Sequence, residues 1–436
     1  MKKRSSYQLK KHWIKKIIRH KKIAIFFVTI SAIFFLILVI LPVPSNTNGF
    51  KSISELQTYA ASLDENIEAE SENWLYPSFE SYYQNKFSST FTKKISKKLS
   101  YMFFKMPPFS ETYFKSLLVE NTQERHESGW HDNFIQKINI DNDSKLIIFG
   151  AIQGAFHSMV RYLEQLQKLD IINEHLQLKD KNTFIVFLGN VINRSPFTLE
   201  TLTIVLKLLK ENPSKVIYLR GTNEFPDYWR RHTLRRELEL RTRDLSNSQI
   251  PLEEEIDNFF NTLPITLYCI LNDSNKNTGS LSYFKISPFI QNEKLKQSLA
   301  EVHIKQFLKS KSTDPITFFN IPKNEAVPHS ISNDGNVELR AVITDILKRE
   351  HYEETDGLRL LSPMDGVIAW TVLSCPTMVY KRAMNFYYDA FVIISPNKLT
   401  KKWQISLFHR DVRKPSKTFV SKSYDFFTGE KIDQSA

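Results

Sequence analysis

Hydrophobic positions are concentrated in three short runs in the middle of the chain. Residues 146–149, 183–188 and 215–220 are rich in Leu, Ile, Val and Phe, and a glycine follows each run. Between these runs, residues 156–168 and 198–210 carry apolar side chains at helical spacing. Apolar runs that alternate with amphipathic helical segments are typical of βαβ units with parallel strands. The pattern therefore predicts an α/β core.

Ligand sites in parallel sheets lie beyond the carboxyl ends of the strands, which is where the three glycines fall. The sequence continues as Gly-Ala-Ile-Gln-Gly from residue 150, as Gly-Asn-Val-Ile-Asn-Arg from residue 189, and as Gly-Thr-Asn-Glu from residue 221. We expect any site to be built from these three segments. His157, which begins the helix after the first of them, is expected on the helix surface.

Further elements follow from the same patterns. Mixed charge at helical spacing over residues 228–244 favours a solvated helix face, and the alternative is a basic docking face for acidic or phosphorylated partners. Residues 253–261 are predicted to be helical, and residues 337–349 to be a helix, or a strand followed by a helix. Strands are predicted at residues 265–271, 281–286, 316–320, 367–374, 389–395 and 403–408.

A basic tail and an apolar segment open the chain. Residues 1–22 contain ten Lys or Arg and no acid, so the tail accounts for most of the formal net charge of +12. Residues 23–41 carry no charge, and a helix of that length rises about 28 Å, close to the roughly 30 Å hydrocarbon core of a bilayer. We predict a single-pass anchor with a cytoplasmic N-terminus and the globular part across the membrane. Because the charge excess lies in the tail, no nucleic-acid partner is expected.

Composition suggests the other boundaries. Residues 47–145 are polar with interspersed aromatics, which favour packing over disorder. This helical prefix is expected to be either a collar packed on the core or a stalk, and residues 128–143 are expected to form a loop. The end of the chain is polar and is expected to be loose. The predicted domains are a basic tail (1–22), a transmembrane helix (23–41), a helical prefix (47–145), a main domain (146–410) and a polar tail (411–436).

The three strand-end segments resemble the GDxHG, GDxxDR and GNHE motifs of the calcineurin-like metallophosphoesterase superfamily. Later segments narrow the resemblance to the PPP-type serine/threonine protein phosphatases, in the family order. Residues 260–265 resemble FNxLPI, 286–288 the end of HGGLSP, 340–341 with 356–357 RAHxxxxDG, and 371–376 TxFSAPNY. The resemblance implies an α/β fold with a two-sheet β-sandwich flanked by helices.

The functional positions depart from the family. The resemblance implies that the proton-donating His corresponds to Asn223 and its orienting Asp to Asn193. Neutral side chains also stand at the positions of the family's metal ligands, which correspond to Ala151, Gln153, Asn190, Thr222, Tyr283 and Val342. Two neighbouring divalent cations need anionic ligands. We therefore expect no metal and no metal-dependent catalysis, whereas the turn glycines are retained for the fold.

Two arginines match the family pattern. The resemblance implies that Arg194 would contact a substrate phosphate, and Arg340 begins the RAH-like motif. A guanidinium suits bidentate phosphate recognition. The alternative is that each arginine pairs with a local acid such as Glu224.

The sequence thus predicts a membrane-anchored, pseudophosphatase-like protein that acts in protein binding or scaffolding, with a protein partner that can be phosphorylated. The competing interpretation is an active phosphoserine/phosphothreonine protein phosphatase with a rearranged site for two divalent ions of the Mn, Fe or Zn type. Some related proteins are effectors that intracellular bacteria deliver into host cells, and the Lys-, Asn- and Ile-rich composition is compatible with such a secreted effector. A purely structural domain is a third interpretation.

Overall fold

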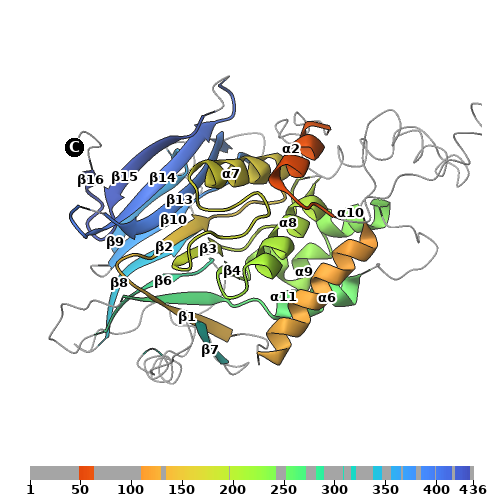
Figure 1. Cartoon of the computed structure of the whole chain (residues 1–436), viewed down its shortest axis with the longest axis horizontal. Helices are drawn as coiled ribbons and strands as arrows, with labels where there is room; N and C mark the ends of the chain where they lie inside the picture. The colour runs from red at the N-terminus through yellow and green to blue at the C-terminus, as the bar shows by residue number, and fades with distance from the viewer. Residues whose placement is uncertain are drawn as a thin grey trace, which may run out of the picture. The chain divides into compact units, whose positions relative to one another are not determined.

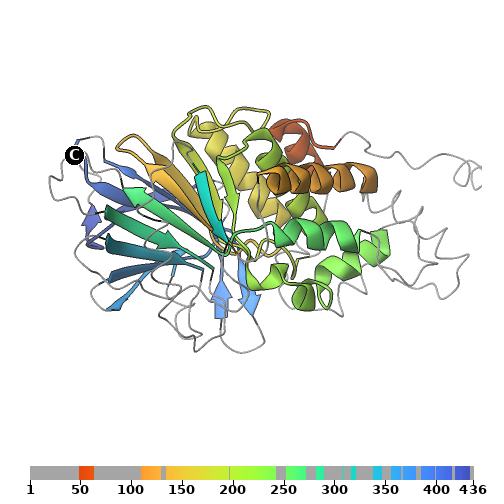
Figure 2. The ribbon, with the colours of Figure 1, turned by 90° about the horizontal axis from the view of Figure 1, so that it is seen from below.

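Two seven-stranded β-sheets packed face to face form the centre of the fold (Figure 2). The predicted α/β class with two sheets is therefore confirmed. The structure is a computed structural model. It describes residues 49–62, 110–128, 134–195, 197–241, 252–271, 281–288, 308, 316–320, 337–345, 355–364, 367–379, 384–397, 399–414 and 418–432.

The first sheet has the strand order β16-β15-β14-β13-β2-β3-β4. Its central strands β2, β3 and β4 pair in parallel, as predicted from the apolar runs. Strand β13 runs antiparallel to both β2 and β14. The bounds are β2 (Lys145–Phe149), β3 (Thr183–Phe187), β4 (Val216–Tyr218), β13 (Tyr388–Pro396), β14 (Trp403–Asp411), β15 (Val420–Asp425) and β16 (Lys431–Ile432).

The second sheet has the order β7-β1-β5-β6-β8-β10-β9 and mixes parallel with antiparallel pairs. Its bounds are β1 (Phe134–Ile140), β5 (Thr266–Leu271), β6 (Leu281–Ile286), β7 (Ile316–Asn320), β8 (Val337–Thr344), β9 (Leu358–Met364) and β10 (Val367–Val372). A separate two-stranded ribbon consists of β11 (Thr377–Val379) and β12 (Met384–Phe386).

The main hydrophobic core lies between the two sheets. Ile148 and Val392 of the first sheet belong to the same fully buried cluster as Leu267 and Ile343 of the second. Inward-facing residues alternate with outward-facing ones along each strand, because successive side chains of a strand point to opposite faces. This shared core makes the pair of sheets a β-sandwich.

Helix α7 follows β2 and helix α8 follows β3, and both helices pack beside the first sheet (Figure 1). In α7, the Tyr162 ring lies 5.2 Å from the ring of Phe149 in β2 and 5.8 Å from that of Phe391 in β13. The helical elements are α2 (Ile53–Ser62), α6 (Glu111–Glu127), α7 (Phe156–Lys168), α8 (Thr198–Glu211), α9 (Pro226–Trp229), α10 (Thr233–Arg241), α11 (Glu253–Asn261) and the 3-10 turn η2 (Thr222–Glu224).

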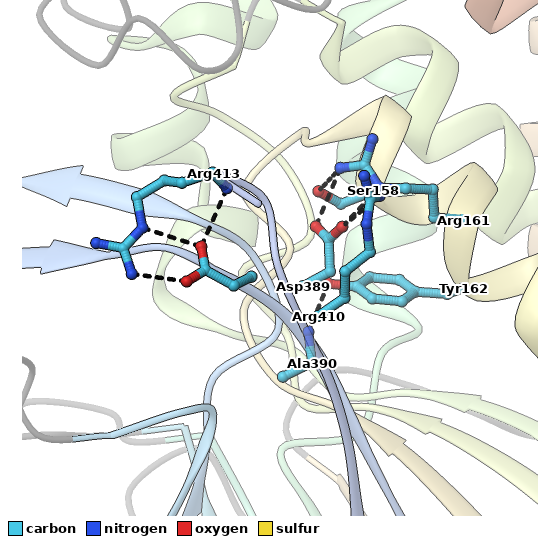
Figure 3. Close-up of polar contacts among 8 residues, drawn as sticks. Ser158, Arg161, Tyr162, Asp389, Ala390, Arg410 and Arg413 are labelled. Carbon is cyan, nitrogen blue, oxygen red and sulfur yellow. Dashed lines mark hydrogen bonds and ion pairs between the residues drawn. The ribbon is translucent and has the colours of Figure 1, made fainter. Parts of the chain in front are cut away.

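A buried ion pair fixes α7 to the first sheet. Figure 3 shows the Asp389 carboxylate between two guanidinium groups. The Arg161 Nε lies 2.5 Å from Asp389 Oδ2, and Arg410 Nη1 lies 3.5 Å from the same oxygen. The Asp389 side chain is fully buried, so these partners offset the cost of taking its charge out of water.

The prefix contributes helices that pack on the main domain. The Tyr59 ring of α2 lies 5.6 Å from the Phe156 ring of α7, and Asn121 of α6 donates to the Leu206 carbonyl of α8 over 3.1 Å. The expectation that His157 lies on the helix surface is wrong. Its side chain is buried beneath α2, and its Nε2 lies 3.1 Å from the Ala60 carbonyl oxygen.

Two expectations at the borders of the main domain are wrong. Within residues 128–143, which we predicted as a loop, the structure has β1, where the polar pair Gln136–Lys137 obscures the alternating pattern. Within the segment 411–436, which we predicted as a loose tail, β15 and β16 extend the first sheet and Phe426 is fully buried in the core. Strand β15 has few buried side chains, so its sequence carries little hydrophobic signal. The sandwich therefore extends beyond 146–410 on both sides.

Across the described ranges, none of the helices combines the length and apolar character needed to cross a bilayer. The predicted basic tail (1–22) and transmembrane helix (23–41) lie outside these ranges.

Candidate functional site

The loops that follow β2 and β3 are joined by backbone hydrogen bonds. The Gln153 N–H donates to the Asn190 carbonyl over 2.9 Å, and the Gly154 N–H donates to the Val191 carbonyl over 2.6 Å. In return, the Ser195 N–H donates to the Gln153 carbonyl over 3.1 Å. Because β2 and β3 are parallel, their carboxyl ends meet at one edge of the sheet. The first two predicted site segments therefore lie against each other.

Glu224 joins the loops after β3 and β4. Its Oε2 accepts hydrogen bonds from the backbone N–H groups of Asn190 and Gly221, each over 2.9 Å. Its Oε1 accepts from the Val191 N–H over 2.9 Å and from the Tyr218 hydroxyl over 2.8 Å. Glu224 is fully buried. Burial raises the pKa of this carboxyl, and the four hydrogen bonds act in the opposite direction.

The turn glycine at position 189 is required by this close approach. Gly189 has φ +84°, and a Cβ there would lie 2.4 Å from the Gly221 nitrogen. Glycine is the residue that adopts this conformation readily. The retained glycine thus serves the junction of two loops, as the sequence suggested.

Asn190 lies where the three loops and β8 meet. Its Oδ1 accepts a hydrogen bond from the Asn223 N–H over 2.9 Å, and its Nδ2 donates to Asp345 Oδ2 over 2.7 Å. Asp345 follows directly after β8 and is buried. Sequence reasoning missed this acid, although a signal was available: it follows the run Ala341–Thr344, at the end of a strand like the glycines.

The remaining polar positions of these loops bond to nearby backbone. Asn223 Nδ2 donates to the Ile192 carbonyl over 3.1 Å. Asn193 has φ 72° and its Oδ1 accepts from the Leu234 N–H over 3.2 Å. These two asparagines therefore bind separate backbone groups, and no hydrogen bond joins their side chains within the described chain.

Arg194 extends from the loop after β3. It has φ 67°, its N–H donates to the Thr233 hydroxyl over 3.0 Å, and its Nη1 donates to Gln153 Oε1 over 3.3 Å. The alternative that Arg194 pairs with Glu224 is wrong, because all four hydrogen bonds of the Glu224 carboxylate go to the backbone amides and the Tyr218 hydroxyl. Arg194 is exposed.

Three predicted positions lie elsewhere. The Tyr283 ring packs 5.7 Å from that of Tyr268 in a separate cluster, against which Val342 also packs. The Arg340 guanidinium lies 4.7 Å above the Phe427 ring and 3.6 Å from a Glu338 oxygen. The structure therefore places Tyr283, Val342 and Arg340 away from the strand-end loops. The segments that follow two strands of the second sheet reach these loops: Asp345 after β8 contacts Asn190, and Ser374 after β10 accepts from the Gly150 N–H over 2.7 Å.

The side chains around the loops do not provide the set of ligands that two divalent cations need. Ala151 has only a methyl side chain, and it forms a β-bridge with Leu373. Both polar atoms of the Asn190 side chain are engaged, and four donors enclose Glu224. Thr222 lies in η2 as a neutral, half-buried residue. Across the described ranges, no group of three His, Cys, Asp or Glu side chains has a geometry suited to a metal ion.

Comparisons with known proteins give resemblances of fold. No family model matches the sequence, and no curated protein matches it. A serine/threonine protein phosphatase of Saccharomyces cerevisiae is similar over 78% of this chain and 97% of its own, with 13% identity and a TM-score of 0.42. A cold-active protein-tyrosine phosphatase of a psychrophilic Shewanella is similar over 65% of this chain and 81% of its own, with 11% identity and a TM-score of 0.35. Vps29 of Chaetomium thermophilum is similar over 67% of this chain and 96% of its own, with 10% identity and a TM-score of 0.27.

Proposed function

We propose that the chain is a phosphoesterase-like protein that binds a phosphorylated protein partner and does not hydrolyse it by metal-dependent chemistry. The observation that carries this proposal is the double hydrogen bond of the Asn190 amide, to Asp345 and to the Asn223 N–H. A neutral amide there joins the loops without a cation. Glu224, the other acid at these strand ends, is enclosed by donors in the same way.

Arg194 supports the binding part of the proposal. Its backbone and its guanidinium are both held by hydrogen bonds, to Thr233 and Gln153, and its side chain is exposed. A positioned guanidinium can donate two parallel hydrogen bonds to a phosphate. Arg340, the second candidate, lies over Phe427 and is left out of the proposed surface.

One observation favours the competing function. Asp345 adds a carboxylate beside Asn190 that the motif comparison did not include. An active enzyme with a rearranged metal site would use this acid as a ligand. Two measurements on the purified full-length protein in detergent separate the functions: metal content by mass spectrometry, and hydrolysis of p-nitrophenyl phosphate with added manganese. We expect substoichiometric metal and no hydrolysis above background, and stoichiometric metal together with turnover would overturn the proposal.

Binding is tested with a fluorescein-labelled phosphoserine peptide and its unphosphorylated counterpart. We expect the full-length protein to bind the phosphorylated form preferentially, and Arg194→Glu to abolish this preference. Arg340→Glu is the matched control, since it reverses the same charge outside the proposed surface. Equal binding of both peptides by the wild-type protein would overturn the binding part of the proposal, and binding of neither peptide would indicate a purely structural domain.

Membrane anchoring through residues 23–41 is part of the same proposal and rests on the length and apolar character of that segment. Resistance to alkaline carbonate extraction, and its loss on deletion of residues 23–41, tests the anchor. Protease protection of the globular part in vesicles tests the predicted orientation. Delivery as a secreted bacterial effector is the alternative route, and recovery of the intact protein outside the producing cell would favour it.

A further inference from the structure

The loop that carries Arg194 is joined to the start of α10. The Arg194 N–H donates to the Thr233 hydroxyl over 3.0 Å, and the Leu234 N–H donates to Asn193 Oδ1 over 3.2 Å. Thr233 is the first residue of α10. Two consecutive residues of the loop therefore contact two consecutive residues of the helix, and this fixes Arg194 next to Arg231 and His232, which immediately precede α10.

Positive charge gathers at this junction without described acidic partners. Arg194, Arg231 and His232 are all exposed. In the part of the chain that the structure describes, no carboxylate lies within 4.0 Å of the Arg194 or Arg231 guanidinium. The neighbouring Arg230 differs, because it forms ion pairs with Glu253, over 2.7 Å, and with Asp257. The charge of Arg230 is thus balanced locally, whereas the other two guanidinium groups face solvent.

His232 lies within the field of both guanidinium groups. Burial lowers its pKa, and the charges of Arg194 and Arg231 lower it further. The remaining titratable neighbour is Tyr228 of α9, whose ring stacks on the imidazole at 6.3 Å between centroids and an angle of 20°. Tyr228 is 46% exposed. Among the described residues, the groups that face His232 are thus two guanidinium groups and the ring of Tyr228.

We propose that Arg194, Arg231 and His232 form one anion-binding surface, which receives the phosphate of a phosphorylated serine or threonine side chain beside the exposed ring of Tyr228. This inference rests on the proposed function and extends it by assigning two of the three phosphate-contacting residues, Arg231 and His232, to the α9–α10 junction. The sequence pattern allowed two interpretations of the charged stretch that contains this junction, a solvated helix face or a basic docking face. The contacts divide it: Arg230 belongs to internal ion pairs, and Arg231 belongs to the docking surface.

The surface has a consequence for pH. An anion bound between the two guanidinium groups offsets the repulsion that they exert on an imidazolium, so it raises the pKa of His232 and favours uptake of a proton. Affinity for a dianion should therefore rise as the pH falls through the pKa of His232. Phosphate takes up its own proton near a pKa of about 6, so inorganic sulfate, which stays dianionic, is the appropriate probe for this dependence.

The test uses the full-length protein and fluorescence anisotropy of the labelled phosphoserine peptide, with sulfate as competitor. Arg231→Gln should weaken peptide binding about threefold to tenfold, as expected for one solvent-facing charged contact. Arg235→Gln is the matched control, because it removes the same charge from the exposed side of α10, and it should change binding less than twofold. His232→Gln should leave sulfate competition unchanged at about pH 8 and should remove its strengthening at about pH 6.

The outcomes distinguish failure of this inference from failure of the proposed function. If Arg194→Glu abolishes binding whereas Arg231→Gln binds like the wild type, the junction plays no part and this inference is overturned, but the proposed function stands. Equal weakening by Arg231→Gln and Arg235→Gln would also overturn it, since it would show a general charge effect. If the wild-type protein binds no phosphopeptide, both proposals fail. Thermal unfolding of each variant confirms that a loss of binding is not a loss of folding.

Discussion

Replacing Glu224 by glutamine tests whether this buried carboxylate holds the strand-end loops together. Each carboxylate oxygen accepts two hydrogen bonds, from the Val191 N–H and the Tyr218 hydroxyl at Oε1 and from the Asn190 and Gly221 N–H groups at Oε2. Three of the four donors are backbone N–H groups that cannot accept, so a carboxyl proton could be placed only on Oε1, and the Tyr218 hydroxyl would have to turn away to accept it. We therefore expect Glu224 to be ionised in the folded protein, although burial raises its pKa.

The magnitude of the effect follows from counting donors. Glutamine keeps one oxygen and turns an NH₂ group toward the two donors that faced the other. The NH₂ group costs least at the Oε1 position, because the Tyr218 hydroxyl can turn and accept from it, so one buried donor, the Val191 N–H, loses its acceptor at about 1–3 kcal/mol. Glu224→Gln should therefore lower the free energy of unfolding by about 2 kcal/mol, a sizeable part of a typical total of about 5–15 kcal/mol.

Urea unfolding followed by tryptophan fluorescence measures this change, since Trp229 and Trp370 are buried. Tyr218→Phe is the matched control, because it removes one donor and leaves the carboxylate in place, and it should cost about 1 kcal/mol. If Glu224 were instead held as the neutral acid, glutamine would mimic it closely. Destabilisation by Glu224→Gln that is no larger than that of Tyr218→Phe would refute the argument for an ionised carboxylate.

Three further substitutions probe the surrounding structure, each checked by thermal unfolding. Asn190→Asp replaces the amide that donates to Asp345 over 2.7 Å by a second carboxylate. Repulsion between the two acids raises a carboxyl pKa in the folded state. The free energy of unfolding should therefore fall by about 1–3 kcal/mol at about pH 7.5, and this loss should be largely absent at about pH 4. Asp389→Asn leaves two guanidinium groups without their shared carboxylate (Figure 3) and should lower the free energy of unfolding by about 3–5 kcal/mol. Asp411→Asn is the control and should lower it by about 1 kcal/mol, because its main partner, Arg413, is half exposed. Gly189→Ala adds a Cβ 2.4 Å from a backbone nitrogen at φ +84° and should cost more than about 1 kcal/mol; unchanged unfolding in any of these variants would contradict the corresponding contact.

The elements that local periodicity specifies were predictable from the sequence. Helix α7 has the predicted bounds, and β2, β3 and α8 agree with their predicted bounds within one residue. These segments bury a continuous apolar face, and their apolar positions repeat with the period of a helix or a strand. Strands β1 and β15 were not predictable in the same way, because their places in the sheets are set by pairing with β5 and β14.

The candidate site was likewise predictable from the sequence in one part and not in the other. The glycines and asparagines after β2, β3 and β4 meet because parallel strands end at one edge, which the sequence pattern specifies. The contribution of the second sheet depends on the pairing of β6 with β8, where the register shifts between Tyr283 and Phe284. A shift of one residue turns a side chain to the other face of a sheet. Motif alignment assigned Tyr283 and Val342, whereas the structure brings Asp345 to the Asn190 side chain.

The hydrogen bond between Asp345 and Asn190 also explains how the loops are joined although most of their polar side chains are neutral. A carboxylate opposite an amide forms a direct hydrogen bond, whereas two carboxylates at the same separation would repel each other unless a proton or a cation lay between them. The Asn190–Asp345 pair therefore joins the end of β3 to the end of β8, and Glu224 joins the loops after β3 and β4 through three backbone N–H groups and the Tyr218 hydroxyl. The proposed surface of Arg194, Arg231 and His232 does not share these contacts, because its guanidinium groups are exposed and are bound to neither Asp345 nor Glu224, and we infer that recognition takes place there.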